Sequence, residues 1–445
     1  MSGATAAHAS YNGSGTQGIA VTNKLNDTGD ITSVFWNKDN NTKQLLHGAS
    51  LIEIPASGSG AAPGGTFTFT LNSDMDAIGD MYVIATLTVP AGGTLAIRKE
   101  YGLLSMINRV EFHCGTQIWQ TLEGDDIIAL NSTELSEGAY EKFVLSSAGY
   151  ITDTSFNRDF SAVSLGTAAV NRVLSFKVPL LTRNLAPMFN NYSNIREDGF
   201  LTAAAPNQTI KVRIFTNTVQ DMSSNFNVTT NTSPTLDLRL FGTHLVMCNE
   251  EREKIRNMPG GLAKRVKITQ NATISSFPLP KSGITTATID CDHFSLYASH
   301  LIIQITDASV FKDSQMGETP SATANNYCSI VDADLRLNST SYCGKVTGAL
   351  MTGPLAETIG LYVNCFFSRS VAGVRTFSYV FPLANFAYSG SGVPLNRFDN
   401  IRLVLRIAYD NPNVAVTDEL LKISVTCVGE STALYKQGAA SISMY

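Results

Sequence analysis

The sequence predicts an all-β protein made of two consecutive β-sandwiches, with a few short helices in the loops. Short segments rich in Val, Ile, Thr, Phe and Tyr recur along the chain and end at turn residues. Few segments show helical periodicity, which is typical of a sandwich or barrel. The strand-like segments form two series on either side of a polar run at residues 220–233, so the 445 residues suit two domains.

We expect three regions: an N-terminal arm over residues 1–47, a first sandwich over 48–232 and a second over 233–445. The arm is polar and lacks periodicity, and contact with a neighbouring molecule would order it. Residues 56–65 are rich in Ser, Gly, Pro and Ala and form a loop.

In the first sandwich, a helix is predicted at residues 124–137, where acidic residues near the start suit the helix dipole. Residues 180–190 form a second short helix or a loop. Alternation and turn residues predict strands at 67–71, 80–89, 106–114, 172–178 and 210–216.

In the second sandwich, a helix is predicted at residues 249–258, with Asn249 as its cap and acids in its first turn. The same strand criteria predict strands at 237–247, 264–274, 300–306, 328–337, 359–369, 376–382, 401–409 and 421–428.

Charged residues make up 16% of the chain, against about 25% in typical soluble domains. Because the cores of interfaces are depleted in charge, this composition favours a protein that packs against other copies. The net charge is -5, whereas nucleic-acid binding relies on Lys and Arg against phosphates. The sequence therefore argues against a protein that coats a genome, and we expect no direct sequence-specific contact with nucleic acid.

No apolar run approaches the ~20 residues needed to span a membrane, and the first residues do not resemble a signal peptide. The seven cysteines are scattered and form no C-x-x-C pair, which favours reduced thiols in a cytosolic setting. A bridge between Cys328 and Cys343 across a loop is the less favoured alternative.

The sequence contains no phosphate-binding loop, no G-x-S-x-G elbow and no H-E-x-x-H motif. A cupin enzyme would need a His-x-His pair, and none of the six histidines forms one. We therefore expect no catalytic residues, no cofactor, no catalytic metal and no hydrolase activity.

Three acidic groups were weighed as sites, and for each we favour the simpler interpretation. Residues 290–293, Asp-Cys-Asp-His, would point to alternate faces of a strand, so a turn is favoured over a metal site. Asp332 and Asp334 would lie about 7 Å apart on one strand, whereas glycosidase carboxylates flank a sugar from opposite sides. Asp125 and Asp126 need no role beyond the start of a helix.

Four segments, in order, resemble the major capsid proteins of nucleocytoplasmic large DNA viruses and their relatives, the polinton-like viruses and virophages. Residues 69–90 resemble an apolar strand that leads through a Gly-Asp step to a long strand ending in Pro. Residues 101–135 resemble a strand, a hairpin centred on Gly115 and a helix. Residues 244–258 resemble a strand followed by an E-E-R helix, and residues 388–403 a loop that leads through Asn, Arg and Asp-Asn to a strand.

The resemblance implies a double jelly roll that forms a homotrimeric, pseudo-hexagonal capsomer in the icosahedral shell of a double-stranded DNA virus. Implied partners are the chain itself, minor capsid and penton proteins, and an internal membrane. The protein would lie in the virion shell after assembly inside the infected host cell.

The fourth segment also contains a candidate structural brace, Arg397 and Asp399. Two residues apart, they can point the same way, while Phe398 points opposite into a core. The pair forms either an ion-paired brace at a domain or subunit junction or a solvated strand end.

Other functions compete with the major capsid role. One is a minor or penton capsid protein, although a penton subunit usually needs one jelly roll. Another is a jelly-roll module that binds a carbohydrate or a receptor, although no stalk is evident. A carbohydrate-active enzyme would need aromatic platforms, and the chain has two tryptophans, Trp36 and Trp119.

Overall fold

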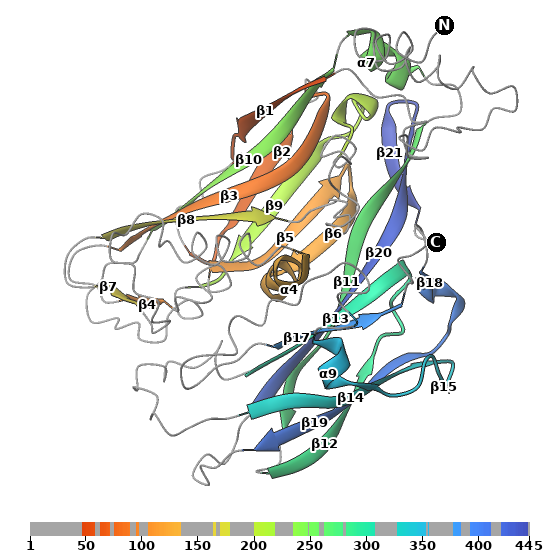
Figure 1. Ribbon diagram of the computed structural model, residues 1–445. Coiled ribbons are helices and arrows are strands. Elements are labelled where there is room, and N and C mark those ends of the chain that lie inside the picture. Colours follow the sequence, from red (N-terminus) through yellow and green to blue (C-terminus); the bar gives the residue numbers. More distant parts are fainter. Residues whose placement is uncertain are drawn as a thin grey trace, which may run out of the picture.

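The computed structural model of the chain has two β-sandwiches (Figure 1). It describes residues 47–57, 63–71, 75–89, 95–97, 106–134, 163–165, 170–178, 200–218, 235–247, 249–257, 262–278, 282–307, 327–352, 355, 377–383, 392–410 and 420–443. The predicted arm, the strand predicted at 359–369 and the segment 180–190 lie outside these ranges, apart from His47.

The first sandwich consists of two antiparallel four-stranded sheets. The first sheet has the order β1 (His47–Ile54), β10 (Thr235–Met247), β3 (Ala77–Val89) and β8 (Val170–Val178). The second has the order β2 (Thr66–Leu71), β9 (Ile210–Thr216), β5 (Ile107–Cys114) and β6 (Gln117–Glu123). A small separate sheet pairs β4 (Leu95–Ile97) with β7 (Val163–Leu165).

The second sandwich repeats this plan. Its first sheet has the order β11 (Leu262–Pro278), β20 (Leu420–Lys436), β13 (Tyr297–Asp307) and β17 (Phe377–Pro382), with β18 (Val393–Pro394) on β13 and β21 (Ala439–Ser443) on β20. Its second sheet has the order β12 (Ser282–Asp290), β19 (Ile401–Asp410), β14 (Tyr327–Leu337) and β15 (Thr340–Ser341), with β16 (Val346–Thr347) on β14.

Strand order identifies both sandwiches as jelly rolls. When the eight main strands of each are ranked along the chain, one sheet reads 1-8-3-6 and the other 2-7-4-5 in both halves. Two four-stranded sheets of this kind are the architecture of the jelly roll. The predicted double jelly roll is therefore confirmed, and the two halves share one topology.

One strand was assigned to the wrong half. Sequence analysis placed residues 237–247 at the start of the second sandwich, beyond a boundary at 232/233. In the structure they belong to β10, whose residues 240–247 pair with the whole of β1 and whose other edge pairs with β3. The second sandwich begins with β11 because a jelly roll places its last strand between its first and its third.

Alternation of apolar and polar residues builds the sandwich cores. In β2, Phe67, Phe69 and Leu71 are buried while the intervening threonines point outward, and β9 alternates in the same way. Burial of such side chains stabilises the fold by about 1.5–3 kcal/mol each. The buried apolar residues of both sandwiches form one continuous cluster.

Short helices lie in the connections. They are α4 (Gly124–Glu134), α7 (Asn249–Arg256), α9 (Gly348–Met351) and the 3-10 turns η4 (Thr202–Ala204) and η7 (Leu395–Arg397). Both predicted helices are present: α4 is described as far as Glu134, and α7 ends at Arg256, earlier than expected. Gly115 forms the predicted hairpin turn between β5 and β6, where a φ of 62° favours glycine.

Candidate functional site: the junction of the two jelly rolls

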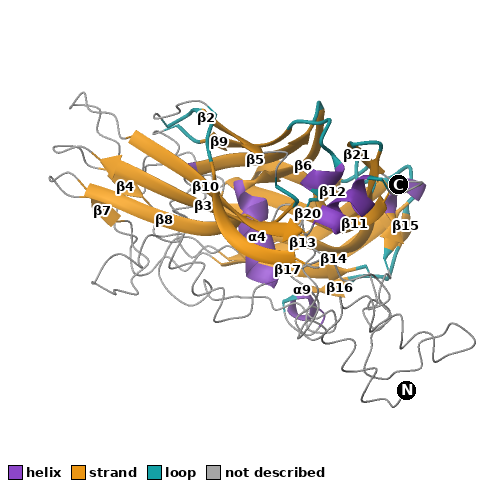
Figure 2. Ribbon diagram, turned by 90° about the horizontal axis from the view of Figure 1, so that it is seen from above, coloured by secondary structure: helices purple, strands orange, loops and turns teal. Residues whose placement is uncertain are grey.

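Helix α4 lies between the two sandwiches (Figures 1 and 2). It follows β6 of the first sandwich and contacts β13, β17 and β20 of the second. Asp126, 1% exposed, accepts a 2.8 Å hydrogen bond from the hydroxyl of Thr426 on β20. Its other carboxylate oxygen accepts the backbone N–H of Glu123 at 2.8 Å. Asp126 therefore both starts the helix and joins it to the second sandwich, a role that sequence analysis missed.

The face of the second sandwich that meets α4 is polar but buried. Thr426, Ser424 and Gln304 point away from their own sandwich core and are at most 2% exposed. On the neighbouring strand, Thr269 accepts a 3.1 Å hydrogen bond from the amide of Gln120 in β6. Because the other jelly roll removes these groups from water, the two hydrogen bonds that cross the junction, from Thr426 to Asp126 and from Gln120 to Thr269, specify how the two halves fit.

An aromatic cluster forms the apolar part of the junction. Phe200 lies with its ring centroid 5.3 Å from Phe112, 5.2 Å from Trp119 and 5.5 Å from Tyr435 of the second sandwich. Edge-to-face pairs at such distances add about 0.5–1.5 kcal/mol to area burial. The hydroxyl of Tyr435 accepts the backbone N–H of Leu201 at 3.3 Å, and burial raises the pKa of that hydroxyl.

The C-terminal hairpin of β20 and β21 extends beyond the second sandwich and contacts the first. The N–H of Asn207 donates to the carbonyl of Gly438 at 3.0 Å, and the N–H of Ala440 donates to the side-chain carbonyl of Gln208 at 2.7 Å. The thiol of Cys114 also donates to Gln208, at 3.0 Å. These contacts, α4 and the aromatic cluster fix the two jelly rolls relative to each other.

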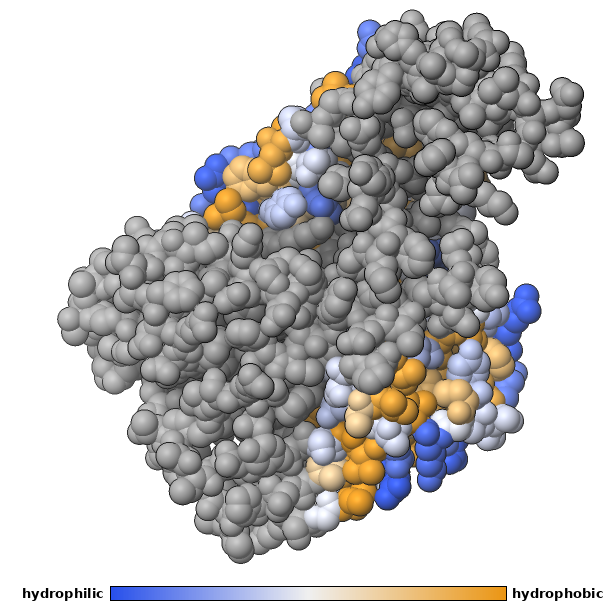
Figure 3. Space-filling view, viewed as in Figure 1, coloured by the Kyte–Doolittle hydropathy of each residue, from blue (hydrophilic) through white to orange (hydrophobic). Residues whose placement is uncertain are grey.

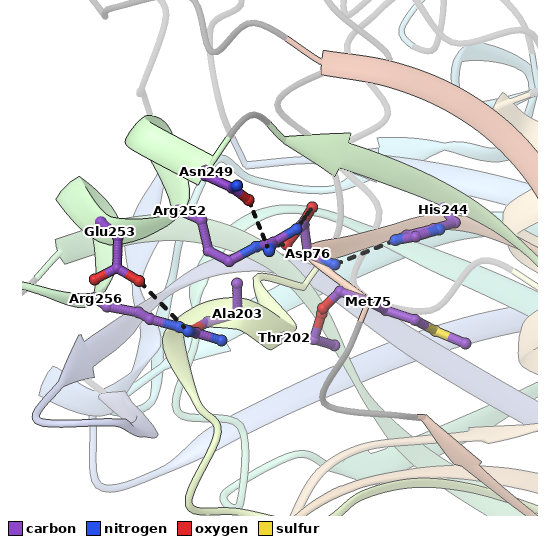
Figure 4. A network of polar contacts seen from close by, with 9 residues as sticks. All are labelled: Met75, Asp76, Thr202, Ala203, His244, Asn249, Arg252, Glu253 and Arg256. Carbon is purple, nitrogen blue, oxygen red and sulfur yellow. Dashed lines mark hydrogen bonds and ion pairs between the residues drawn. The ribbon is translucent and has the colours of Figure 1, made fainter.

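A polar network attaches the link between the jelly rolls to the first of them (Figure 4). Asp76 is 1% exposed, and its carboxylate accepts hydrogen bonds from Nε and Nη2 of Arg252 on α7. The N–H of Asp76 donates to His244 at 3.2 Å, and its carbonyl accepts the N–H of Ala203 at 3.0 Å. Arg256 donates to the carbonyl of Ala203 at 3.2 Å. Helix α7 is therefore held in place by groups that lie far apart in the sequence.

Replacing Arg252 with alanine is expected to lower the free energy of unfolding by about 2 kcal/mol, because it removes the charge partner of a buried carboxylate. The partly exposed position of Arg252 keeps the loss below that of a fully buried pair. Arg256→Ala is the matched control on the same helix, and a smaller loss is expected from it, since Arg256 bonds to a neutral carbonyl, that of Ala203, and pairs with the exposed Glu253 at 3.8 Å. Urea denaturation of both variants measures the difference, and equal losses would contradict the assigned role of Arg252.

The predicted brace residues lie near the start of β19. Arg397 ends η7 and Asp399 follows two residues later, and both are exposed. The N–H of Asp399 donates to the side-chain carbonyl of Asn338 at 3.0 Å, while Phe398 packs against the core as expected. The structure shows no ion pair between Arg397 and Asp399, and a brace at a subunit junction stays a prediction.

The acidic groups weighed as sites have separate structural partners. Asp290 ends β12 and residues 291–293 form the turn after it, where the side chain of Asp290 accepts the N–H of Asp292 at 3.1 Å. Asp332 pairs with Arg406 at 2.7 Å and Asp334 with Arg336 at 3.0 Å. Within the described residues, no group of three or more His, Cys, Asp or Glu side chains is arranged to hold a metal ion.

The structure describes the side chains of four cysteines, and all four are free thiols. Cys114, Cys291 and Cys427 are buried, and burial raises the pKa of Cys114 and of Cys291 to about 12. Cys343 is exposed and free, so it forms no bridge with Cys328 in this structure.

His300 lies in the buried polar face of β13. It is 4% exposed, its Nδ1 lies 2.8 Å from the hydroxyl of Ser299, and its Nε2 has no hydrogen-bond partner within the described structure. Burial, with a smaller contribution from the charge of Lys267, lowers the pKa of His300 to about 3. The folded protein therefore holds this imidazole neutral, whereas in the unfolded chain it is protonated below about pH 6.5.

Because the unfolded chain binds more protons below that pH, stability should fall as the pH drops from about 6.5 towards 3. His300→Gln is expected to remove up to about 2 kcal/mol of the stability difference between about pH 7 and pH 4.5. Urea titrations of the two proteins at both pH values measure this. An unchanged pH dependence in the variant would show that His300 does not contribute.

None of the helices in the described part of the chain is both long and apolar enough to cross a membrane.

No protein-family model matches the sequence, and no curated protein sequence is significantly similar to it. Solved structures do match. VP54 of PBCV-1 superposes with a TM-score of 0.64 at 12% identity, over 94% of this chain and 100% of that one. The chain shares the fold of viral capsid proteins.

Two further matches extend the likeness. The Faustovirus major capsid protein has a TM-score of 0.55 at 8% identity, over 93% of this chain and 97% of its own. The mavirus major capsid protein has a TM-score of 0.51 at 11% identity, over 93% of this chain and 94% of its own. The whole double jelly roll, and not one half of it, is therefore common to this chain and these major capsid proteins.

Proposed function

We propose that the chain is a major capsid protein, the subunit of a homotrimeric, pseudo-hexagonal capsomer in the icosahedral shell of a double-stranded DNA virus. The observation that carries the proposal is the match of a complete double jelly roll to VP54 of PBCV-1 and to a chain of the PBCV-1 virus capsid. A single jelly roll, as in most penton subunits or binding modules, would cover only about half of such a chain.

The duplicated topology supports a trimer on physical grounds. Three chains, each with two sandwiches of the same strand order, provide six similar units around one axis. A threefold arrangement closes a heterologous interface without leaving a free surface. The buried hydrogen bonds of Asp126 and Gln120 keep the two units of each chain in a fixed relation, which a regular tile requires.

The remaining parts of the proposal follow from the same role. The protein would act as a structural component without catalytic activity, and it would reside in the virion after assembly in the infected cell. Minor capsid proteins, penton proteins and an internal membrane would be its neighbours in the shell. The N-terminal arm would contact one of these neighbours or another capsomer.

Sedimentation equilibrium of the purified full-length chain tests the trimer. The proposal predicts a species with three times the 47.8 kDa mass of one chain at micromolar concentration. A chain that is folded by circular dichroism yet remains monomeric at such concentrations would contradict it.

A further inference from the structure

The outer faces of the two equivalent sheets differ in their exposure. In the second sandwich, His300, Ile302 and Gln304 point outward from β13 and are at most 4% exposed, because the first sandwich covers that sheet through α4. In the first sandwich, the equivalent strand β3 points Tyr82 and Ile84 outward, and both are partly exposed. Within the described residues, the outward side chains of this strand are therefore buried in one half and partly exposed in the other.

The outer face of the β1-β10-β3-β8 sheet in the first sandwich is suited to a contact with another protein surface. Besides Tyr82 and Ile84, it includes Phe241 on β10 and Leu51 on β1, which is 62% exposed. Arg239 pairs with Glu53 beside them, so polar and apolar groups alternate on the surface over β1, β10 and β3 (Figure 3). Extended apolar areas on soluble proteins mark interaction sites.

The second sandwich has an element that corresponds to α4. Helix α4 follows the fifth main strand of the first sandwich, β6, and α9 follows the fifth main strand of the second, β15, after the short β16. Among the described residues α9 contacts β14, β16 and β17 of its own sandwich, whereas α4 contacts the other sandwich, and Leu350 on α9 is 45% exposed. Tyr342, in the preceding turn, is 42% exposed.

The structure holds α9 firmly in this position. Gly348 at its start lies so close to β14 that an added Cβ would be 1.8 Å from the carbonyl oxygen of Ile330. Met351 on its inner side is 0% exposed. The exposed Leu350 is therefore presented on a rigid element, as a contact residue requires.

We propose that the α9 segment of one copy docks on the outer face of the β1-β10-β3-β8 sheet of a second copy, in the way that α4 docks on the β11-β20-β13-β17 sheet within one chain. The inference rests on the proposed homotrimer and assigns its contact surfaces. Each copy then offers one helix and one face, so the contact is heterologous and repeats around the ring until it closes.

Glutamate substitutions on either surface test the proposal. Leu350→Glu and Ile84→Glu each place an unpaired charge in the contact, and each should raise the concentration at which half of the protein is trimeric by at least about tenfold. Ile284→Glu is the matched control, because Ile284 is 54% exposed on β12, outside both surfaces. Sedimentation velocity across a concentration series measures the three variants and the unmodified chain.

Mixing the two variants tests the direction of the contact. The Ile84→Glu chain keeps an unchanged α9, and the Leu350→Glu chain keeps an unchanged β1-β10-β3-β8 face. One chain of each kind can therefore form one contact that contains neither substitution. The mixture should give a dimer that neither variant forms alone and that cannot close into a trimer. Circular dichroism should show unchanged folding, and Ser replaces Glu at either position where it does not.

The outcomes separate the two proposals. If the unmodified chain is a trimer and both variants remain trimers at the same concentrations, the contact surfaces are wrong while the capsomer stands. If both variants dissociate but the mixture forms no dimer, the helix-to-face pairing is wrong. If the unmodified chain does not form trimers at all, the proposed function and this inference both fail.

Discussion

Replacing Phe200 with alanine is expected to destabilise the protein by about 3–5 kcal/mol, among the largest effects of any single truncation here. Phe200 is 0% exposed and its ring contacts Phe112, Trp119 and Tyr435. The substitution leaves a cavity where the two jelly rolls meet, and the surrounding strands can close it only in part. Urea denaturation followed by tryptophan fluorescence measures the loss, since Trp119 belongs to the cluster.

Phe215→Ala is the control for this experiment. Phe215 lies on β9 with its ring 4.2 Å from the guanidinium carbon of Arg109, and it is only partly buried. Its truncation should cost about 1 kcal/mol. A loss for Phe200→Ala no greater than that for Phe215→Ala would show that the aromatic cluster does not stabilise the junction.

Replacing Gly348 with alanine is the second change with a large expected effect. The added Cβ would lie 1.8 Å from the carbonyl oxygen of Ile330, which is backbone and cannot rotate away. Either α9 or β14 must shift, and we expect a loss of about 3 kcal/mol or a displaced α9. Thermal unfolding measures the loss, and limited proteolysis reports whether α9 has left its place.

Gly344→Ala separates overlap from backbone strain. Gly344 has a φ of +81° but no atom within 4 Å of an added Cβ, so only the strain of a left-handed residue applies, about 1 kcal/mol. A similar loss for the two variants would contradict the close approach of α9 to β14.

Local pattern was sufficient to predict much of the fold. The alternation of Phe67, Phe69 and Leu71 with threonine predicted β2. Asn249 and the acids after it predicted the start of α7. Each of these signals lies within a few residues of the element that it predicts.

The pairing of strands that lie far apart in the sequence could not be predicted from local pattern. Residues 237–247 look like any strand after a polar linker, and only their pairing with β1 and β3 shows that they close the first sandwich. β1 and β12 were missed as strands, because their mixed sequences carry little alternation of apolar and polar residues.

The contacts at the junction of the two jelly rolls could not be predicted from the sequence either. Thr426 and Gln304 are polar residues in strands, so they read as solvent-facing, yet the other jelly roll buries them. Asp126 reads as an ordinary acid at a helix start, and its bond to Thr426 joins positions 300 residues apart. A contact between two domains does not change the spacing of apolar residues along a strand or a helix, so the sequence pattern does not reveal it.

Electron microscopy of the purified full-length protein in negative stain tests the central claim most directly. The account predicts particles with threefold symmetry and a nearly hexagonal outline, built from six sandwich-sized lobes, two from each chain. Particles that show two lobes only, or an assembly with another symmetry, would contradict the capsomer proposed for this double jelly roll.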